Sequence, residues 1–341
     1  MRSTTPLGLE QRNIVVIERH LPRTEEAVKL TTSYICTNFT NQFAQIQHKS
    51  IPAMNSRQLA KAAIPAYACP EGTKMHLLDL GSLSCEEGWL FTAGGSATAS
   101  NPQRPRKWRD LMVLAGLIDH PEMGLILFET GCAEDIEIKW NPANADVFPR
   151  TRYEPGHRLP AAIKAAGYDI KDVKAVIMGH LHLDHAGGLE HFLNTDVPIY
   201  VHEEEFKHAC WGAGTKAEEG SYLPDYLPLD GSLNWQTFND SQLDLCTGIT
   251  LHLCPGHTPG LCIMQVNLPQ DGTFIWTTDQ FHVRENYEKN HAQGWLLRDH
   301  KSWMDSTNFI RRLQRLYSAT LIFGHDLEVG TALIQQKPFY Q

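Results

Sequence analysis

The sequence predicts an α/β fold in which β-sheets are covered by helices. Short apolar runs with strand-forming residues alternate with amphipathic stretches of helical spacing, and this alternation occurs in two halves of the chain. The chain has 341 residues, of which 42% are hydrophobic and 20% are charged. These values are typical of a globular protein with one large domain and an appendage, or with two domains.

Residues 1–74 differ in composition from the rest of the chain. They contain no glycine between Gly8 and Gly72, and their helix-compatible stretch SRQLAKAAIPAYA is interrupted by Pro65. We interpret residues 1–74 as an N-terminal extension that wraps the core, lines the mouth of an active site or contacts another subunit. The last of these options would make the protein a homodimer. Residues 75–341 are expected to form the main, catalytic domain.

The first half of the main domain contains a predicted hairpin and a strand–helix alternation. Strand-forming runs at residues 111–118 and 125–129 flank the turn sequence DHPEMG. The stretch RLPAAIKAAGYD predicts a helix that ends at Gly167, and the strand KAVIMG follows it. The sequences AGGLEHFLN and EEEFKHACW predict helices on either side of the strand PIYVH.

The second half contains three predicted strands, a long helix and a final strand. The stretch TGITLHLCPGHTPGLCIMQVNLPQDGTFIWTTD predicts strands connected by PGHTPG and PQDG. Apolar residues at helical spacing over residues 301–317 predict an amphipathic helix, and the strand TLIF and a short tail follow it.

Charge and cysteine content disfavour several classes of partner. The net charge is −9, and the densest basic segments, RPRKWR and RRLQR, are short, so we expect no nucleic-acid partner. The apolar run at residues 14–17 is flanked by Glu10 and Glu18, which predicts neither a signal peptide nor a membrane span. The eight cysteines show no CxxC pair and are interpreted as reduced thiols. We therefore expect a cytoplasmic protein without membrane contacts.

A cluster of histidines and an aspartate directly follows the predicted strand KAVIMG. In GHLHLDH, the turn after the strand can direct alternate side chains into one small volume, which groups His180 with His182 and places Asp184 and His185 nearby. Imidazole and carboxylate donors without thiolate suit zinc and leave coordination positions open for water. An open site of this kind is typical of catalysis.

Three further donors stand where predicted strands end. His257 follows ITLHLC, Asp279 follows FIWTT and His325 follows TLIF. Alone, a histidine in a Gly-Pro turn or an aspartate after Thr-Thr is more often a solvated loop residue or a cap. Together with the cluster, the three donors indicate one metal centre built from distant segments.

These motifs resemble those of the metallo-β-lactamase superfamily. HxHxDH followed by His, Asp and His has the order typical of that superfamily, and GHLHLDHAGGL, PGHTPG, TDQFHVRENYE and FGHD are most similar to the N-acyl-homoserine lactone lactonases. The resemblance begins near Met75. It implies an αββα sandwich with four layers and a dinuclear metal site at the sandwich edge, which holds two Zn²⁺ per chain. The implied ligands are His180, His182 and His257 for one ion, Asp184, His185 and His325 for the other, and Asp279 between them.

The resemblance also implies an activity. A dizinc hydrolase of this type opens a cyclic ester or cyclic amide when hydroxide generated at the metals attacks the ring carbonyl, and Asp184 and Asp279 can also hold or relay the proton. A lactonase acting on acyl-homoserine lactones is favoured. One alternative is a lactamase that opens a cyclic carbamate or lactam such as a benzoxazolinone. An alternative of another class is a catalytically silent protein that binds metal or ligand.

One position departs from the lactonase pattern. The lactonases carry a tyrosine three residues after the bridging aspartate, and this chain has His282 there. An imidazole can deliver a proton near neutral pH, which suits a nitrogen leaving group, although a solvated loop position is an equally open interpretation. Trp89 and Tyr222 are further candidates, as residues lining an apolar substrate pocket.

Overall fold

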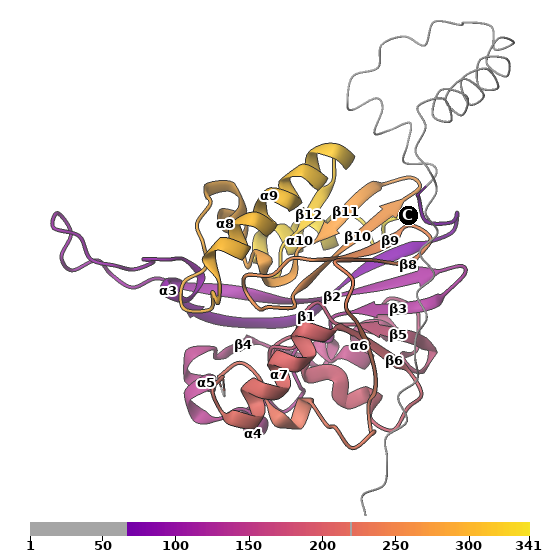
Figure 1. The fold of residues 1–341 in the computed structure, drawn as a ribbon, viewed down its shortest axis with the longest axis horizontal. Coiled ribbons are helices and arrows are strands. Elements are labelled where there is room, and N and C mark those ends of the chain that lie inside the picture. The colour runs from indigo at the N-terminus through magenta and orange to yellow at the C-terminus, as the bar shows by residue number, and fades with distance from the viewer. Residues whose placement is uncertain (1–66, 219) are drawn as a thin grey trace, which may run out of the picture. The chain divides into compact units, whose positions relative to one another are not determined.

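Two β-sheets packed face to face, with helices on both outer faces, form the fold (Figure 1). The computed structural model describes residues 67–218 and 220–341. The extension expected over residues 1–74 therefore lies mostly outside the described residues, and its role stays a prediction. The four layers are those of the αββα sandwich, so the predicted fold class is confirmed.

The first sheet has seven strands in the order β4-β1-β2-β3-β5-β6-β7. β2 and β3 form the predicted antiparallel hairpin, whereas β3, β5, β6 and β7 run parallel to one another. The strand bounds are β1 (Lys74–Glu86), β2 (Trp108–His120), β3 (Gly124–Phe128), β4 (Arg150–Arg152), β5 (Val173–Ile177), β6 (Pro198–His202) and β7 (Asn234–Phe238).

The second sheet has five strands in the order β12-β11-β10-β9-β8. Its central strand β10 is buried at every position because both of its faces are covered. β11 and β12 are parallel, and β9 runs in the same direction because both β9 and β11 pair antiparallel with β10. The bounds are β8 (Gln242–Cys246), β9 (Ile249–Leu253), β10 (Cys262–Leu268), β11 (Gly272–Trp276) and β12 (Thr320–Ile322).

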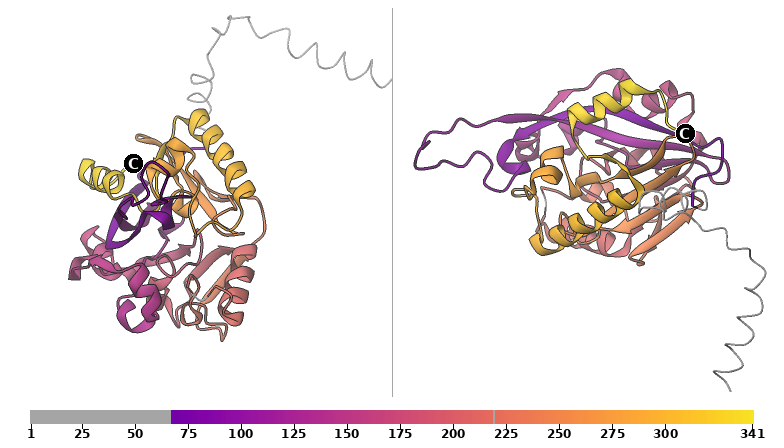
Figure 2. Two further views of the ribbon diagram at one scale, coloured as in Figure 1. Left: turned by 90° about the vertical axis from the view of Figure 1, so that its left-hand side faces the viewer. Right: turned by 90° about the horizontal axis from the view of Figure 1, so that it is seen from above.

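Helices cover the outer face of each sheet, as Figure 1 shows. α4, α6 and α7 pack on the first sheet through a shared apolar core, and α8 and α9 pack on the second. Seen from above, the segment between α3 and β2 extends away from the sheets (Figure 2). The helix bounds are α3 (Glu87–Leu90), α4 (Ile136–Lys139), α5 (Pro142–Val147), α6 (Leu159–Ala165), α7 (Glu203–Thr215), α8 (Arg284–Lys289), α9 (His300–Tyr317) and α10 (Leu327–Gln336).

Local sequence signals account for several helix boundaries. The Asp299 carboxylate accepts a hydrogen bond from the Ser302 N–H at the start of α9, and Asp326 accepts one from the Val329 N–H at the start of α10. Gly167, with φ of +96°, lies just beyond α6 and ends it as predicted. None of the described helices combines the length and the apolar composition needed to cross a membrane.

One expected helix has a different geometry, and one helix was not expected. The segment 186–194, where a helix was expected, forms a 3-10 helix (Gly187–Phe192) that begins with two glycines packed against the backbone near Thr130 and Ala133. The expected short tail contains α10, whose Leu333 and Ile334 pack against the core between the sheets. Within α10 only Gly330 is fully buried.

The sheet directions place four segments at one edge of the sandwich. The carboxyl ends of β9, β11 and β12 meet at the same edge of the second sheet, since these strands run in the same direction. The segment after β5 comes to this edge from the first sheet, where the Cys262 N–H donates to the Gly179 carbonyl. The predicted donors lie in the segments that follow these four strands.

The core between the sheets depends on close packing at Gly116 of β2. A methyl group at this position would come within 2.8 Å of the Trp276 ring, which is 2% exposed. We expect Gly116→Ala to lower the free energy of unfolding by about 1–3 kcal/mol, because the buried ring has no space to move into. Denaturant unfolding followed by circular dichroism measures this change.

Gly156 provides the matched control. A Cβ atom there would meet no atom within 4 Å, so Gly156→Ala should change stability by less than about 0.5 kcal/mol. Equal stability of the two variants would contradict the packing argument.

Candidate metal centre

Four segments from both sheets bring the predicted donors together at one edge of the sandwich. His180, His182, Asp184 and His185 lie in the segment after β5. His257 follows β9, Asp279 lies in the 3-10 helix Thr278–Gln280 after β11, and His325 follows β12. The structure thus brings all seven predicted donors to one edge, and most of them are almost fully buried.

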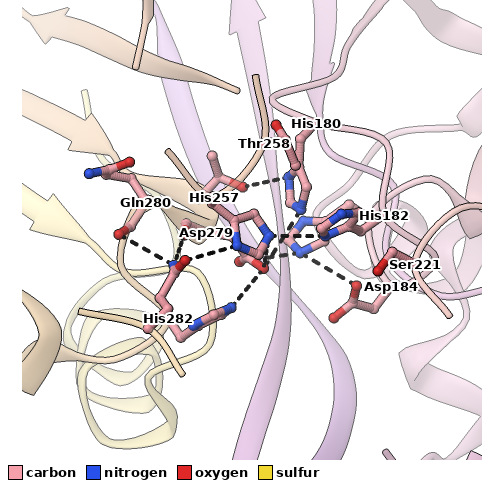
Figure 3. Close-up of polar contacts among 12 residues, drawn as sticks. His180, His182, Asp184, Ser221, His257, Thr258, Asp279, Gln280 and His282 are labelled. Carbon is pink, nitrogen blue, oxygen red and sulfur yellow. Dashed lines mark hydrogen bonds and ion pairs between the residues drawn. The ribbon is translucent and has the colours of Figure 1, made fainter. Parts of the chain in front are cut away.

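A first group of donors surrounds one carboxylate oxygen of Asp279. Oδ2 of Asp279 lies 3.3 Å from Nε2 of His257 and 3.6 Å from Nε2 of His180. Nδ1 of His182 is 2.9 Å from Nε2 of His257. Figure 3 shows the three imidazoles converging on Asp279. Each of these four residues offers a donor atom within 4.8 Å of the others, which is close enough for a single cation.

A second group surrounds the other oxygen of Asp279. Oδ1 lies 3.0 Å from Nε2 of His325 and 3.3 Å from Nε2 of His185. Asp184 completes this group, with Oδ2 at 3.5 Å from Nε2 of His325. The Asp279 carboxylate therefore presents one oxygen to each group.

The donor set fits cations. Nε2 of His180 and Nε2 of His182 are buried and have no hydrogen-bond partner among the described residues. Leaving such an atom unpaired costs about 1–3 kcal/mol, a cost that a bound cation removes. The set contains imidazole nitrogen and carboxylate oxygen and no thiolate, and divalent zinc accepts this combination.

Burial keeps the first group of imidazoles neutral. It lowers the pKa of His180 and of His182 well below the usual value, and that of His257 to about 3. At neutral pH each of these rings therefore keeps a lone pair for a cation.

The second group behaves in the opposite way. Burial by itself lowers the pKa of His185, but the nearby carboxylates, with Asp279 foremost, outweigh it and raise the pKa well above the usual value. The same balance raises the pKa of His325. This group therefore holds protons until a cation displaces them, so binding here releases protons.

Two buried glutamates that the sequence analysis did not single out hold this centre in place. Glu129 follows β3; its Oε2 lies 3.3 Å from Nδ1 of His185 and its Oε1 accepts the Gly179 N–H at 3.1 Å. A carboxylate behind a ligating imidazole orients the ring. Glu129 stands directly after an apolar strand, which is the signal that located His257 and His325 and could have located Glu129 as well.

Glu205 of α7 connects two of the donor segments. Its carboxylate accepts hydrogen bonds from the Leu181 N–H at 2.9 Å, the Tyr222 hydroxyl at 3.1 Å and the Thr258 hydroxyl at 2.5 Å. Leu181 lies between two donors and Thr258 follows His257. The three glutamates in EEEFKHACW look alike in sequence, and only the fold shows that the third is buried.

A small pocket opens above the two groups. Its polar part comes from the donors and from His282, and its apolar walls come from segments distant in sequence. The apolar wall residues are Leu90, Leu111, Phe148, Leu183 and Leu296.

The expectation that Trp89 and Tyr222 line this pocket differs from the structure. Tyr222 is fully buried behind His182, with its ring 4.7 Å away, and its hydroxyl is bound by Glu205. Trp89 packs against Phe148, which itself faces the pocket. In each case a sequence neighbour lines the pocket instead, namely Leu90 and Ser221.

His282 lines the pocket and is not a solvated loop residue. Its side chain is 2% exposed, and Nε2 lies 3.2 Å from Oδ2 of Asp279, on the opposite side from His180 and His182 in Figure 3. Neither ring nitrogen has a hydrogen-bond partner in the described part of the chain. His282 is thus placed to contact a molecule in the pocket.

Comparisons with known proteins agree with this geometry. The family model of the metallo-beta-lactamase superfamily matches residues 108–325. The N-acyl homoserine lactonase AiiB of Agrobacterium fabrum is 26% identical over 279 residues, which cover 79% of this chain and 100% of the relative. The N-acyl homoserine lactonase AttM of Rhizobium radiobacter is 30% identical over 187 residues, which cover 52% of this chain and 67% of that protein.

Solved structures show the same fold. An AiiA variant from Bacillus thuringiensis with N-decanoyl-L-homoserine bound at its active site aligns with a TM-score of 0.63 at 25% identity, covering 76% of this chain and 95% of that chain. A second structure, an N-acyl homoserine lactone hydrolase with N-hexanoyl-L-homoserine at its catalytic metal center, aligns with a TM-score of 0.62 at 25% identity, covering 76% and 95%. With its fold, its histidine clusters and these matches, the chain belongs to the metallo-β-lactamase superfamily and is a metal-dependent hydrolase.

Proposed function

We propose that this chain is a dizinc hydrolase that opens a cyclic ester, with N-acyl-homoserine lactones as the favoured substrate class. The observation that carries the proposal is the position of Asp279, whose two oxygens face separate groups of buried donors beneath an apolar pocket. The relatives named N-acyl homoserine lactonase support the choice of a lactone.

The proposed ligands form two sets, which correspond to the two groups of donors around Asp279. His180, His182 and His257 would hold one zinc ion, and a second set would hold the other, with Asp279 shared between them. The second set is Asp184, His185 and His325. When bound, the two ions would supply hydroxide at neutral pH and polarise the carbonyl of the ring.

Residues of the chain would position the substrate and handle its proton. Leu111, Leu183 and Leu296 would exclude water and hold an apolar substituent. Neither lysine nor arginine is among the residues lining this pocket, so a neutral ring fits it better than a carboxylate-bearing one. Asp184, whose side chain is 18% exposed, would hold or relay the proton at the pocket floor.

A second candidate, a lactamase that opens a cyclic carbamate or lactam, is favoured by His282. This residue stands where the lactonases carry a tyrosine and lines the pocket; its Nε2 faces Asp279 at 3.2 Å, and its Nδ1 has no hydrogen-bond partner among the described residues. A nitrogen leaving group departs as an amine only after it gains a proton, and a protonated imidazole (imidazolium) delivers one more readily than a phenol does near neutral pH.

Metal content and ring opening test the proposed function together. The protein as purified should contain two zinc ions per chain and hydrolyse N-hexanoyl-homoserine lactone, which a pH-stat measures. Asp279→Ala should lose zinc from both positions and reduce turnover by more than about 100-fold, because both groups share this carboxylate.

His191→Gln is the control for this experiment, because His191 lies outside the donor set and contacts Glu134 at 3.6 Å. It should keep both zinc ions and normal turnover. Zinc bound without hydrolysis of any lactone, lactam or carbamate would contradict the proposed activity and favour the silent binding protein. A protein that takes up no zinc would contradict the metal centre itself.

Substitution of His282 distinguishes lactone from lactam substrates. If His282 protonates a nitrogen leaving group, His282→Tyr and His282→Ala should lower kcat for a lactam, in which nitrogen is the only leaving atom, by at least about 100-fold and for the lactone by less than about 10-fold. Steady-state kinetics on both substrates measure this difference. Equal losses on the two substrates would show that His282 does not serve as the proton donor.

A further inference from the structure

Gln293 is a fully buried amide in the segment between α8 and α9 that contacts two of the proposed ligands. Its Oε1 lies 3.0 Å from Nδ1 of His257. Its Nε2 donates to the backbone carbonyl of Asp279 and lies 3.5 Å from that of Gln280. The side chain therefore connects the segment after β9 with the segment after β11.

These contacts define the orientation of the amide. The carbonyl oxygens of Asp279 and Gln280 can only accept hydrogen bonds, so the NH₂ group of Gln293 must face them. The opposite orientation would place Oε1 against two acceptors. Oε1 of Gln293 therefore faces His257 and can only accept from it.

The orientation of the amide selects one form of the His257 imidazole. Since Oε1 accepts, Nδ1 of His257 carries the proton, and the lone pair of the neutral ring lies on Nε2. Nε2 is the atom that faces Oδ2 of Asp279 at 3.3 Å and Nδ1 of His182 at 2.9 Å. This is the nitrogen that the first donor group offers to a cation.

The backbone around Gln293 is held from both sides. The Thr92 hydroxyl donates to the Gln293 carbonyl at 2.8 Å, and the Thr92 N–H donates to the Ala292 carbonyl at 2.8 Å. Gly294 packs so closely on Gly88 that a side chain there would overlap the Gly88 carbonyl. The amide is thus presented from a rigid support next to α3.

We propose that Gln293 is a positioning residue that holds His257 in the form and orientation that bind the first metal ion. This inference rests on the proposed metal centre. It assigns a role to a segment that carries none of the seven donors and that also supplies Leu296 to the pocket wall. Among the described interactions, Gln293 has no contact with Asp184, His185 or His325, the residues that form the second donor group.

The same chain contains a matched pair away from the centre. Gln265 of β10 is also buried; its Oε1 lies 3.1 Å from Nε2 of His252 and its Nε2 donates to Oδ1 of Asn267 at 3.0 Å. Gln265→Leu therefore removes the same kind of amide–imidazole contact from a core position without touching the donors.

The experiment compares Gln293→Leu with Gln265→Leu in the full chain. Zinc affinities of both positions are measured by competition with a chromophoric chelator, and the tautomer of His257 is measured in the zinc-free protein by long-range ¹H–¹⁵N NMR. Gln293→Leu should weaken one of the two zinc affinities by about 10–100-fold and leave the other within a few-fold. The signals of His257 should change from the Nδ1-protonated form to a mixture of both tautomers.

The outcomes separate this inference from the proposed function. A wild-type protein that binds no zinc would overturn the metal centre and the inference with it. A wild-type protein that binds two zinc ions, with Gln293→Leu as unaffected as Gln265→Leu in zinc affinity and in the His257 tautomer, would overturn the inference alone. Loss of both affinities in both variants would indicate a general loss of structure and would also contradict a role specific to Gln293.

Discussion

The buried carboxylate of Asp279 is the constraint on which the organisation of this protein depends. It is 3% exposed and lies among five imidazoles contributed by four segments. An isolated carboxylate in such a place is strongly unfavourable, so it must be paired with positive charge. The parallel arrangement of β9, β11 and β12 serves this need because it brings their ends to one side.

The same carboxylate makes the two donor groups unequal. In the first group burial outweighs the nearby carboxylates and lowers the pKa of the rings, that of His257 to about 3, so these rings stay neutral. In the second group Asp184 and Glu129 add negative charge, and the pKa of His185 rises well above its usual value. A cation that binds the second group must displace protons, whereas one that binds the first finds the lone pairs already free. This asymmetry follows from which carboxylates are near and not from the identity of the donors, which are mostly histidines in both groups.

Sequence reasoning located the donors because they share a local signal. Each stands where an apolar strand ends, and strand ends at one edge of a sandwich meet in space. The residues that hold the donors carry no such signal, apart from Glu129. Glu205 is one of three consecutive glutamates and Gln293 lies in a segment without regular structure, so their contacts follow only from packing between segments far apart in the chain. The sequence was also insufficient to identify the pocket lining, because the side chains that face the pocket are Leu90 and Ser221 and not their neighbours Trp89 and Tyr222.

Attack on the carbonyl group and departure of the leaving group depend on different residues. The donors and the residues that hold them determine the attack on a carbonyl group. The segment that carries them aligns with a lactonase along that relative's whole length. The choice of ring depends on the leaving atom and therefore on the group that meets it. In this chain the candidate for that group is His282, which follows the short 3-10 helix that carries Asp279 and lies 3.2 Å from its carboxylate. His282 also contacts the donors themselves, because its ring stacks on that of His325 and meets that of His257 edge-on, whereas Glu129 and the Met112 carbonyl contact the donor rings from other segments. Family membership therefore constrains the attack on the carbonyl more tightly than it constrains the substrate.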